Sequence, residues 1–214
     1  MRAEDPRVKR TRKLLLDAFT DLLAERNFHA ISVQDIAERA TVNRATFYAH
    51  FVDKYALLDH LVREQFREAL AARGLAVAPF TADNFRLLIE TVLEFVGRIH
   101  GRCRPSDRDM EPAIETCIEQ ELAAFLRDWL MGMPRADATI RLEPGTAAAI
   151  LSWAIFGAGI EWSRSPDDGS AAQWAEQVLL LLSNGLSVVG APPAGSPSGG
   201  SASLAAARQA VPRR

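Results

Sequence analysis

The chain has 214 residues, of which 48% are hydrophobic and 24% are charged, and its formal net charge is −2. This length and composition allow one or two packed cores and place the chain in the ordinary globular class. The two cysteines, Cys103 and Cys117, belong to no CxxC pattern, which suggests neither a disulfide framework nor a zinc module and fits a reducing cytoplasm. No apolar stretch approaches the roughly 18 residues of a membrane span, and the first residues lack the apolar core of a secretion signal, so we expect a soluble cytoplasmic protein.

A basic run lies near the start of the chain. Residues 7–13 read RVKRTRK and place five cations in seven positions. Apolar residues at helical spacing follow directly and predict a first helix, namely Leu15, Leu16, Phe19, Leu22 and Leu23. The cations either lie near a nucleic-acid phosphate backbone or form a solvated charge run at a helix end, and the next stretch of sequence favours the first interpretation.

The stretch from Ala30 to Lys54 predicts two short amphipathic helices joined by a tight turn. Ser32 offers a hydroxyl cap with the carboxylate of Asp35 three residues on, and apolar residues then repeat at helical spacing. Asn43 is a good cap for a second helix over residues 44–51. Because the second helix presents polar side chains to solvent, the pair has the helix-turn-helix arrangement, in which the second helix enters a major groove of DNA.

Within this stretch the sequence resembles the amino-terminal signature of the tetracycline-repressor (TetR) family. The resemblance spans roughly residues 10–62, with identities at both buried and exposed positions: Val33-x-Asp35-Ile36-Ala37, then Val42-x-x-x-Thr46-Phe47-Tyr48-x-His50-Phe51-x-Asp53-Lys54-x-x-Leu57-Leu58. One departure is Thr41, where the family usually has glycine in the turn. Since threonine tolerates a positive φ poorly, we expect a turn that is less tight or slightly strained.

The candidate DNA-binding residues follow from side-chain chemistry and from this resemblance. Arg44 can give a bidentate contact to guanine, Gln34 can reach a base edge, and Ala45 is small enough to lie against a thymine methyl. Hydroxyl, ring and ammonium donors suit phosphate contacts, and the resemblance agrees for the set Thr46, Tyr48, His50 and Lys54. Two of these have a structural alternative, because Tyr48 could pack half-buried against the first helix and His50 could cap a carbonyl.

The remainder of the chain predicts helices only. A longer helix runs from Lys54 to about Arg73, residues 80–189 carry helical stripes separated by turn-forming residues, and residues 190–214 are rich in Gly, Pro and Ser. No alternating strand pattern with hairpin turns is present in the sequence. We therefore predict an all-α fold, with a three-helix helix-turn-helix DNA-binding head at 1–53, a helical effector-binding and dimerisation bundle at 54–189, and a flexible tail at 190–214.

The last two predicted helices, at about residues 144–164 and 171–189, carry more apolar surface than one small bundle hides. Such a surface points to a partner subunit, and the resemblance implies that the last two long helices form a two-fold four-helix dimer interface. The candidate interface residues are Trp153, Gly157, Trp174, Val178, Leu181 and Leu182. The alternative is an ordinary buried hairpin in a monomer.

The resemblance also implies a small-molecule effector, which would enter the bundle, shift the helix that starts at Lys54 and change the separation of the two heads. Candidate pocket residues are Phe85, Ile89, Phe125, Trp129, Trp153 and Trp162. For each of them the alternative is an ordinary core position. The lack of a charged cluster favours an apolar or aromatic ligand.

Motifs for catalysis or metal binding are weak. The Gly-x-Gly that starts at Gly157 has Trp162 where a dinucleotide-binding loop needs a small residue, and His100-x-x-Cys103 supplies, with Cys117, only part of a metal site. We predict a non-enzymatic homodimeric repressor, without cofactor or metal, that an effector releases from double-stranded operator DNA. The alternatives are an effector-independent DNA-binding regulator and a thiol-based sensor that uses the two cysteines.

Overall fold

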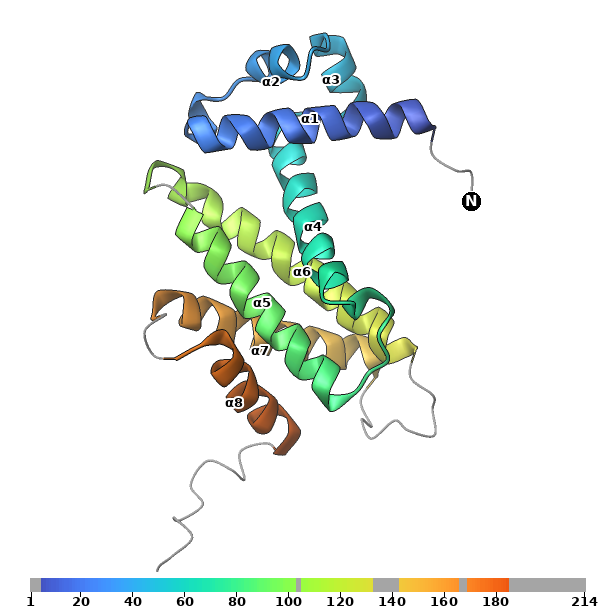
Figure 1. The fold of residues 1–214 in the computed structure, drawn as a ribbon, viewed down its shortest axis with the longest axis vertical. Coiled ribbons are helices and arrows are strands. Elements are labelled where there is room, and N and C mark those ends of the chain that lie inside the picture. The colour runs from blue at the N-terminus through green and yellow to red at the C-terminus, as the bar shows by residue number, and fades with distance from the viewer. Residues whose placement is uncertain (1–4, 103–104, 133–142, 166–168, 185–214) are drawn as a thin grey trace, which may run out of the picture.

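The structure, a computed structural model, describes residues 5–102, 105–132, 143–165 and 169–184, and this part of the chain is built from helices without a strand (Figure 1). In chain order the elements are α1 (Pro6–Glu25), η1 (Phe28–Ala30), α2 (Val33–Arg39), α3 (Arg44–His50), α4 (Lys54–Ala72), η2 (Leu75–Val77), α5 (Ala82–Arg102), η3 (Pro105–Met110), α6 (Glu111–Met131), α7 (Pro144–Arg164) and α8 (Ala171–Asn184), where η marks a 3-10 helix. The predicted all-α fold is confirmed. None of the described helices combines the length and the apolar character that a membrane span requires.

Side-chain caps fix where the short helices of the head begin. Ser32 accepts a hydrogen bond from the N–H of Asp35, and the Asp35 carboxylate accepts one from the N–H of Ser32 at 2.8 Å, which closes a reciprocal capping box. Asn43 accepts from the N–H of Thr46 at 2.7 Å at the start of α3. Asp53 caps α4 in the same way. The caps predicted at Ser32 and Asn43 are confirmed, and each of the three caps satisfies a backbone N–H that the helix itself cannot pair.

The core of the head lies between α1 and the pair α2 and α3. Phe19 of α1 and Phe47 of α3 are fully buried, and Ile36 of α2 is buried beside them. In Figure 1, α1 lies beneath α2 and α3 and crosses the upper end of α4. Ile36, Phe47 and Phe51 are all buried, and this packing leaves the opposite face of α3 to solvent.

The turn between α2 and α3 holds a residue in the left-handed region. Thr41 has a φ of 57°. No other non-glycine residue among the described residues has a positive φ. A β-branched side chain in this conformation crowds the following carbonyl. The expected strain in this turn is therefore present, at the position where the family usually has glycine.

Thr41→Gly is expected to raise the free energy of unfolding by about 0.5–1 kcal/mol. Removing the side chain relieves about 1–2 kcal/mol of left-handed strain, and the greater freedom of glycine in the unfolded chain returns about 0.5–1 kcal/mol of that gain. Urea denaturation measures the change. The matched control is Thr116→Gly inside α6, which should lower stability; a loss of stability for Thr41→Gly as well would contradict the strain.

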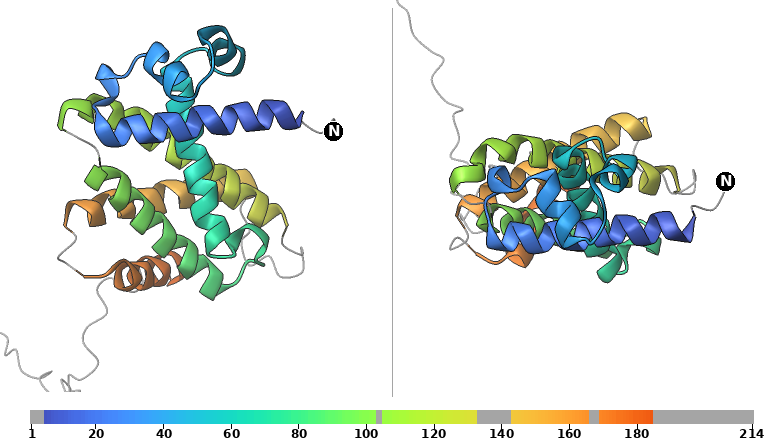
Figure 2. Two further views of the ribbon diagram at one scale, coloured as in Figure 1. Left: turned by 45° about the horizontal axis from the view of Figure 1, so that its top comes forward. Right: turned by 90° about the horizontal axis from the view of Figure 1, so that it is seen from above.

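The body is a bundle that α4 joins to the head. In Figures 1 and 2, α4 runs from beneath α1 down into the body, where α5, α6 and α7 pack together and α8 lies against α5. One close approach needs glycine, because a Cβ on Gly97 of α5 would lie 2.7 Å from the ring of Trp162 on α7. The aromatic ring therefore fills the space that Gly97 leaves, and it holds α5 against α7.

The segment after α5 forms a short helix. The α5 helix continues through Gly101 to Arg102, and η3 follows at Pro105–Met110. This helix places residues 105–110 against the head, as described below. Cys103, the predicted end of α8 at 185–189 and the predicted tail at 190–214 lie outside the described residues.

Candidate nucleic-acid interface

The outer face of α3 presents the predicted contact residues that are most exposed. Arg44 and Ala45 are exposed, and Tyr48 is 49% exposed. The Arg44 guanidinium lies 3.4 Å from the Tyr48 hydroxyl and 5.9 Å from the ring centroid, as expected for residues four apart on one helix face. The face therefore holds one cation, one phenol and one methyl within a single helical turn. About half of the Tyr48 surface is exposed, so a DNA contact is open to it, and packing against α1 remains the alternative.

Two further predicted residues are engaged within the head. Gln34 is exposed on α2, and its side-chain amide donates to the carboxylate of Glu38. The Thr46 hydroxyl lies 3.0 Å from the Asn43 side-chain oxygen. A hydroxyl has one proton to donate. To donate to a DNA phosphate, the Thr46 hydroxyl would therefore have to turn away from Asn43. His50 is half-buried at the end of α3.

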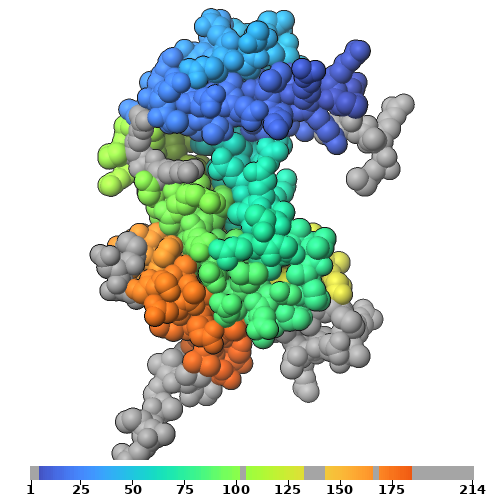
Figure 3. Space-filling view, in the orientation of Figure 1, coloured from blue at the N-terminus to red at the C-terminus, as the bar shows by residue number. Residues whose placement is uncertain are grey.

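The amino-terminal half of α1 adds a basic surface. Its exposed cations are Arg7, Lys9, Arg10 and Lys13. In Figures 1 and 2, α3 lies over this half of α1, and the space-filling view shows the head as a layer above the body (Figure 3). Cations that border an exposed recognition helix suit the phosphates that flank a groove.

Lys54 has a different position from the one expected of a phosphate contact. Its ammonium donates to the carbonyls of Phe28 at 3.0 Å, Ile31 at 2.8 Å and His29 at 3.4 Å, and it lies 4.5 Å from the Phe28 ring centroid. An ammonium has three protons, so these three carbonyls use its donor capacity. Burial lowers the pKa of Lys54 below its usual value, and the nearby Asp107 carboxylate offsets only part of this shift. The structure thus turns Lys54 inward, where it holds η1 against the start of α4, and the phosphate contact of Lys54 stays a prediction.

A second set of bonds joins η1 to the body. The N–H of Phe28 donates to the Asp107 carboxylate at 3.1 Å, and the His29 ring lies 3.0 Å from the Asp109 carboxylate. Phe28 itself is 2% exposed. These residues were absent from the predicted sites, and their contacts span about 80 positions of sequence, so no local pattern could have indicated them.

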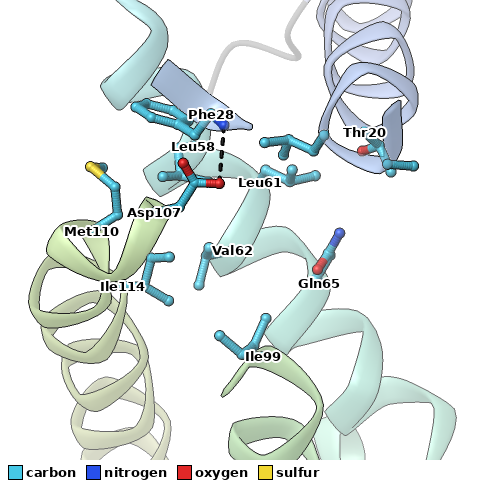
Figure 4. Close-up of a pocket in the computed structure, with 12 residues that line it drawn as sticks. Thr20, Phe28, Leu58, Leu61, Val62, Gln65, Ile99, Asp107, Met110 and Ile114 are labelled. Carbon is cyan, nitrogen blue, oxygen red and sulfur yellow. Dashed lines mark hydrogen bonds between the residues drawn. The ribbon is translucent and has the colours of Figure 1, made fainter. Parts of the chain in front are cut away.

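A cavity of about 530 Å³ lies at this head–body junction (Figure 4). It is lined by Thr20, Leu23, Ala24, Phe28, Leu58, Leu61, Val62, Gln65, Ile99, Asp107, Met110 and Ile114. These residues come from α1, η1, α4, α5, η3 and α6, so the head and the body share the walls. The volume is in the range of cavities that hold drug-sized ligands.

None of the six residues predicted to line a ligand pocket lines this cavity. Ile89 is fully buried and Phe85 nearly so. The Trp129 ring packs against Phe80 and Phe125, and its N–H donates to a backbone carbonyl. The N–H of Trp162 donates to the carbonyl of Gly169 at 3.0 Å, and Trp153 lies on the outside of α7, 61% exposed. In the structure these residues take part in packing or lie on an outer surface, and their role in ligand binding stays a prediction.

The outer face of α7 and part of α8 form an exposed apolar surface. Ile150 is 56% exposed and Trp153 61% exposed, and a Cβ on Gly157 would meet nothing within 4 Å. On α8, Leu180 and Leu181 are exposed. The other predicted interface residues, Trp174, Val178 and Leu182, are partly buried against the core of the chain itself. The predicted interface set is therefore divided between an open face and packing within the chain.

The described residues near the second cysteine do not form a reactive site. Cys117 is 3% exposed, and burial raises the pKa of its thiol to about 12. Since the thiolate is the reactive form, this thiol is inert near neutral pH. No group of three or more His, Cys, Asp or Glu residues lies close enough to hold a metal within the part of the chain that the structure describes.

His100 joins three helices of the body. Its ring lies 2.8 Å from the Ser163 hydroxyl and 3.2 Å from the Glu115 carboxylate. The same hydroxyl also lies 2.6 Å from the carbonyl of Ile160 in its own helix. A serine within a helix, with its one proton shared in this way, suits a cross-link between helices better than a nucleophile.

Comparisons with known proteins agree with this geometry. Residues 15–61 match the family described as bacterial regulatory proteins, tetR family. Over 76 residues the chain is 38% identical to the uncharacterized HTH-type transcriptional regulator YxbF of Bacillus subtilis (strain 168), a match that covers 35% of this chain and 20% of that protein. The matched region thus spans about a fifth of the length of this relative.

Solved structures share the fold over a longer stretch. The fatty acid degradation regulator FadR from Bacillus halodurans has a TM-score of 0.53 and 19% identity, covering 86% of this chain and 98% of its own. A TetR-family transcriptional regulator from Pectobacterium atrosepticum has a TM-score of 0.51 and 18% identity, covering 84% of this chain and 94% of its own. At these identities the likeness carries the fold alone. The family match covers residues 15–61, which include the helices that build the exposed α3 face, so this part of the chain is similar to the tetR family of bacterial regulatory proteins.

Proposed function

We propose that this protein is a transcriptional regulator that binds double-stranded operator DNA with α3 in the major groove. The observation that carries the proposal is the exposed pair Arg44 and Tyr48 on α3, held outward because Phe47 on the opposite face is fully buried. Arg44 reads a guanine edge, and Tyr48, His50 and the α1 cations border the phosphates. Gln34, Ala45 and Thr46 remain secondary contacts of the same face. Such a protein works where the DNA is, in the cytoplasm.

We further propose a homodimer formed through α7 and α8. An apolar surface that includes Ile150, Trp153 and Leu181 is open in the single chain, and exposed apolar surfaces of this kind mark interfaces. A two-fold dimer carries two heads, which can read half-sites about 34–36 Å apart, one turn of DNA from each other. We accordingly place the domain boundary at Lys54. The DNA-binding head precedes this residue, and the dimerisation bundle begins with it.

In the proposed mechanism a small-molecule effector releases the repressor from its operator. Head and body share the walls of the junction cavity, so an occupant would act on both, and a ligand with unequal affinity for two arrangements shifts the protein between them. The FadR of Bacillus subtilis, 19% identical with a TM-score of 0.50, was crystallised with stearoyl-CoA. Acyl-CoA is therefore one compound class to test. An effector-independent regulator is the alternative, and a sensor that depends on Cys117 is disfavoured by the inert thiol.

Selection from a pool of randomised duplexes, followed by fluorescence anisotropy, tests the proposal. The full-length protein should enrich one two-fold symmetric site and bind it with two chains per duplex. Binding to that site should survive moderate salt better than binding to a scrambled duplex, because specific contacts add to the phosphate term. Enrichment of no sequence, or equal and salt-fragile binding to both duplexes, would count against a sequence-specific regulator.

Arg44→Ala and Tyr48→Phe are expected to differ in kind. Arg44→Ala should cost about 1–3 kcal/mol of discrimination at one base position, whereas Tyr48→Phe removes one hydroxyl and should weaken binding to all duplexes alike. Anisotropy with the selected site and its single-base variants separates the two results. A uniform loss for Arg44→Ala would show that its guanidinium contacts phosphate instead of a base.

A further inference from the structure

The junction cavity has walls from both parts of the chain. Thr20 and Phe28 belong to the head, Val62 to α4, and Asp107 and Ile114 to the body. Figure 4 shows these side chains around one space, with the Asp107 carboxylate directed toward the backbone of Phe28. We propose that this cavity binds an apolar small molecule that carries an amine, with the ammonium on Asp107, and that the occupant loosens the link between Phe28 and Asp107.

The lining determines the chemical class of the occupant. Most of the lining residues are aliphatic or aromatic, and burial of an apolar ligand against them is favourable in proportion to the area covered. Asp107 is the only ionisable residue among those that line this cavity. A carboxylate attracts a cation and repels a second anion in surroundings of low polarity. The cavity therefore selects an apolar amine over its neutral analogue, and it disfavours the corresponding acid.

Asp107 is already part of the head–body link. One of its carboxylate oxygens accepts the N–H of Phe28 at 3.1 Å. An ionised carboxylate offers about four lone-pair sites, so it can also receive a ligand donor. A charge-assisted hydrogen bond from an ammonium is stronger than one from a neutral amide, so a carboxylate that turns toward the ligand gives up its bond to Phe28.

The link leads directly to the recognition helices. Phe28 begins η1, and η1 is followed by Ile31 and by Ser32, which caps α2. The Lys54 ammonium donates to the carbonyls of Phe28 and Ile31. The Asp107 carboxylate accepts the N–H of Phe28. Releasing the bond to Asp107 loosens η1 from the body without undoing the Lys54 bonds, and the contact between His29 and Asp109 remains. The effect of the ligand on DNA binding rests on the proposed function, whereas ligand binding itself does not.

Direct titration tests the site without DNA. The probes are 1-pyrenemethylamine, 1-pyrenemethanol and 1-pyrenecarboxylate, which share one apolar ring system and differ in one group. Pyrene fluorescence on the full-length protein gives each Kd. The amine should bind at least about tenfold more tightly than the alcohol, as a hydrogen bond to a charged group implies, and the carboxylate should bind most weakly. No saturable binding, or a preference for the carboxylate, would overturn the proposal.

Variants connect the binding to the cavity. Asp107→Asn keeps an oxygen that can accept the Phe28 N–H, so the fold should persist while the preference for amine over alcohol disappears. Ile114→Trp fills the cavity and should weaken the amine and the alcohol alike by at least about tenfold. The control is Asp128→Asn, an exposed carboxylate elsewhere on α6, which should leave all three affinities unchanged. Wild-type affinities in both cavity variants would show that the probes bind elsewhere.

The link to DNA is tested separately on the selected duplex. Saturating 1-pyrenemethylamine should lower the DNA affinity of the wild type by at least about tenfold, and it should have no effect on Ile114→Trp. Binding of the amine without any change in DNA affinity would overturn the loosening of the Phe28 link and leave DNA binding itself intact. Failure to find any specific duplex would count against the proposed function, while the fluorescence result would still decide the site.

Discussion

Replacing Trp153 by glutamate is expected to convert the dimer into a monomer and to lower operator affinity at least about a hundredfold. Trp153 is 61% exposed on α7, so the substitution adds a carboxylate without opening a hole in the single chain. In the proposed dimer the same carboxylate would be buried without a cation, which costs about 3–5 kcal/mol. Since 1.4 kcal/mol corresponds to tenfold, dissociation follows, and one head alone cannot span two half-sites.

Analytical ultracentrifugation and anisotropy on the selected duplex measure the two effects. The matched control is Val77→Glu, which also replaces an exposed apolar residue, 92% exposed on η2, an element outside the proposed interface. It should remain a dimer with wild-type affinity. Leu181→Glu on α8 should behave like Trp153→Glu. Sedimentation of both interface variants as intact dimers would place the interface on another surface.

Much of the head could be predicted because its determinants are local. Ser32 and Asp35 cap each other across three residues, and Asn43 reaches Thr46 over the same distance. Such contacts depend on sequence spacing alone, so the sequence specifies the helix starts directly. The strained turn at Thr41, whose φ is positive, was predicted from the resemblance, because the family usually has glycine at this position.

The junction could not be predicted, because its contacts depend on how distant segments fold together. The bond from Phe28 to Asp107 joins residues 79 positions apart, and each residue alone has an unremarkable local sequence. The choice of pocket residues from the sequence met the same limit. Periodicity identified Trp153 and Trp162 as apolar helix positions, but it could not show that one faces solvent and the other fills the space at Gly97.

Lys54→Met is expected to lower the free energy of unfolding by about 2 kcal/mol, because hydrogen bonds to a charged group are worth about 1.5–3 kcal/mol. The substitution keeps the length of the side chain and removes all three donors. The carbonyls of Phe28 and Ile31, which accept at 3.0 and 2.8 Å, then lose their partner, and η1 loses its attachment to α4. Urea denaturation in the absence of DNA measures the loss.

Lys9→Met provides the matched comparison, because Lys9 is an exposed cation on α1. Lys9→Met should leave stability unchanged and, if Lys9 contacts phosphate, reduce the salt slope of DNA binding by about one counterion. Lys54→Met should do the reverse, with reduced stability and an unchanged salt slope for the fraction that remains folded. A Lys54→Met protein of wild-type stability with a reduced slope would restore the phosphate role and show that the ammonium leaves the three carbonyls when DNA binds. The position of one ammonium group thus decides whether this lysine contacts the operator or maintains the geometry of the helices that do.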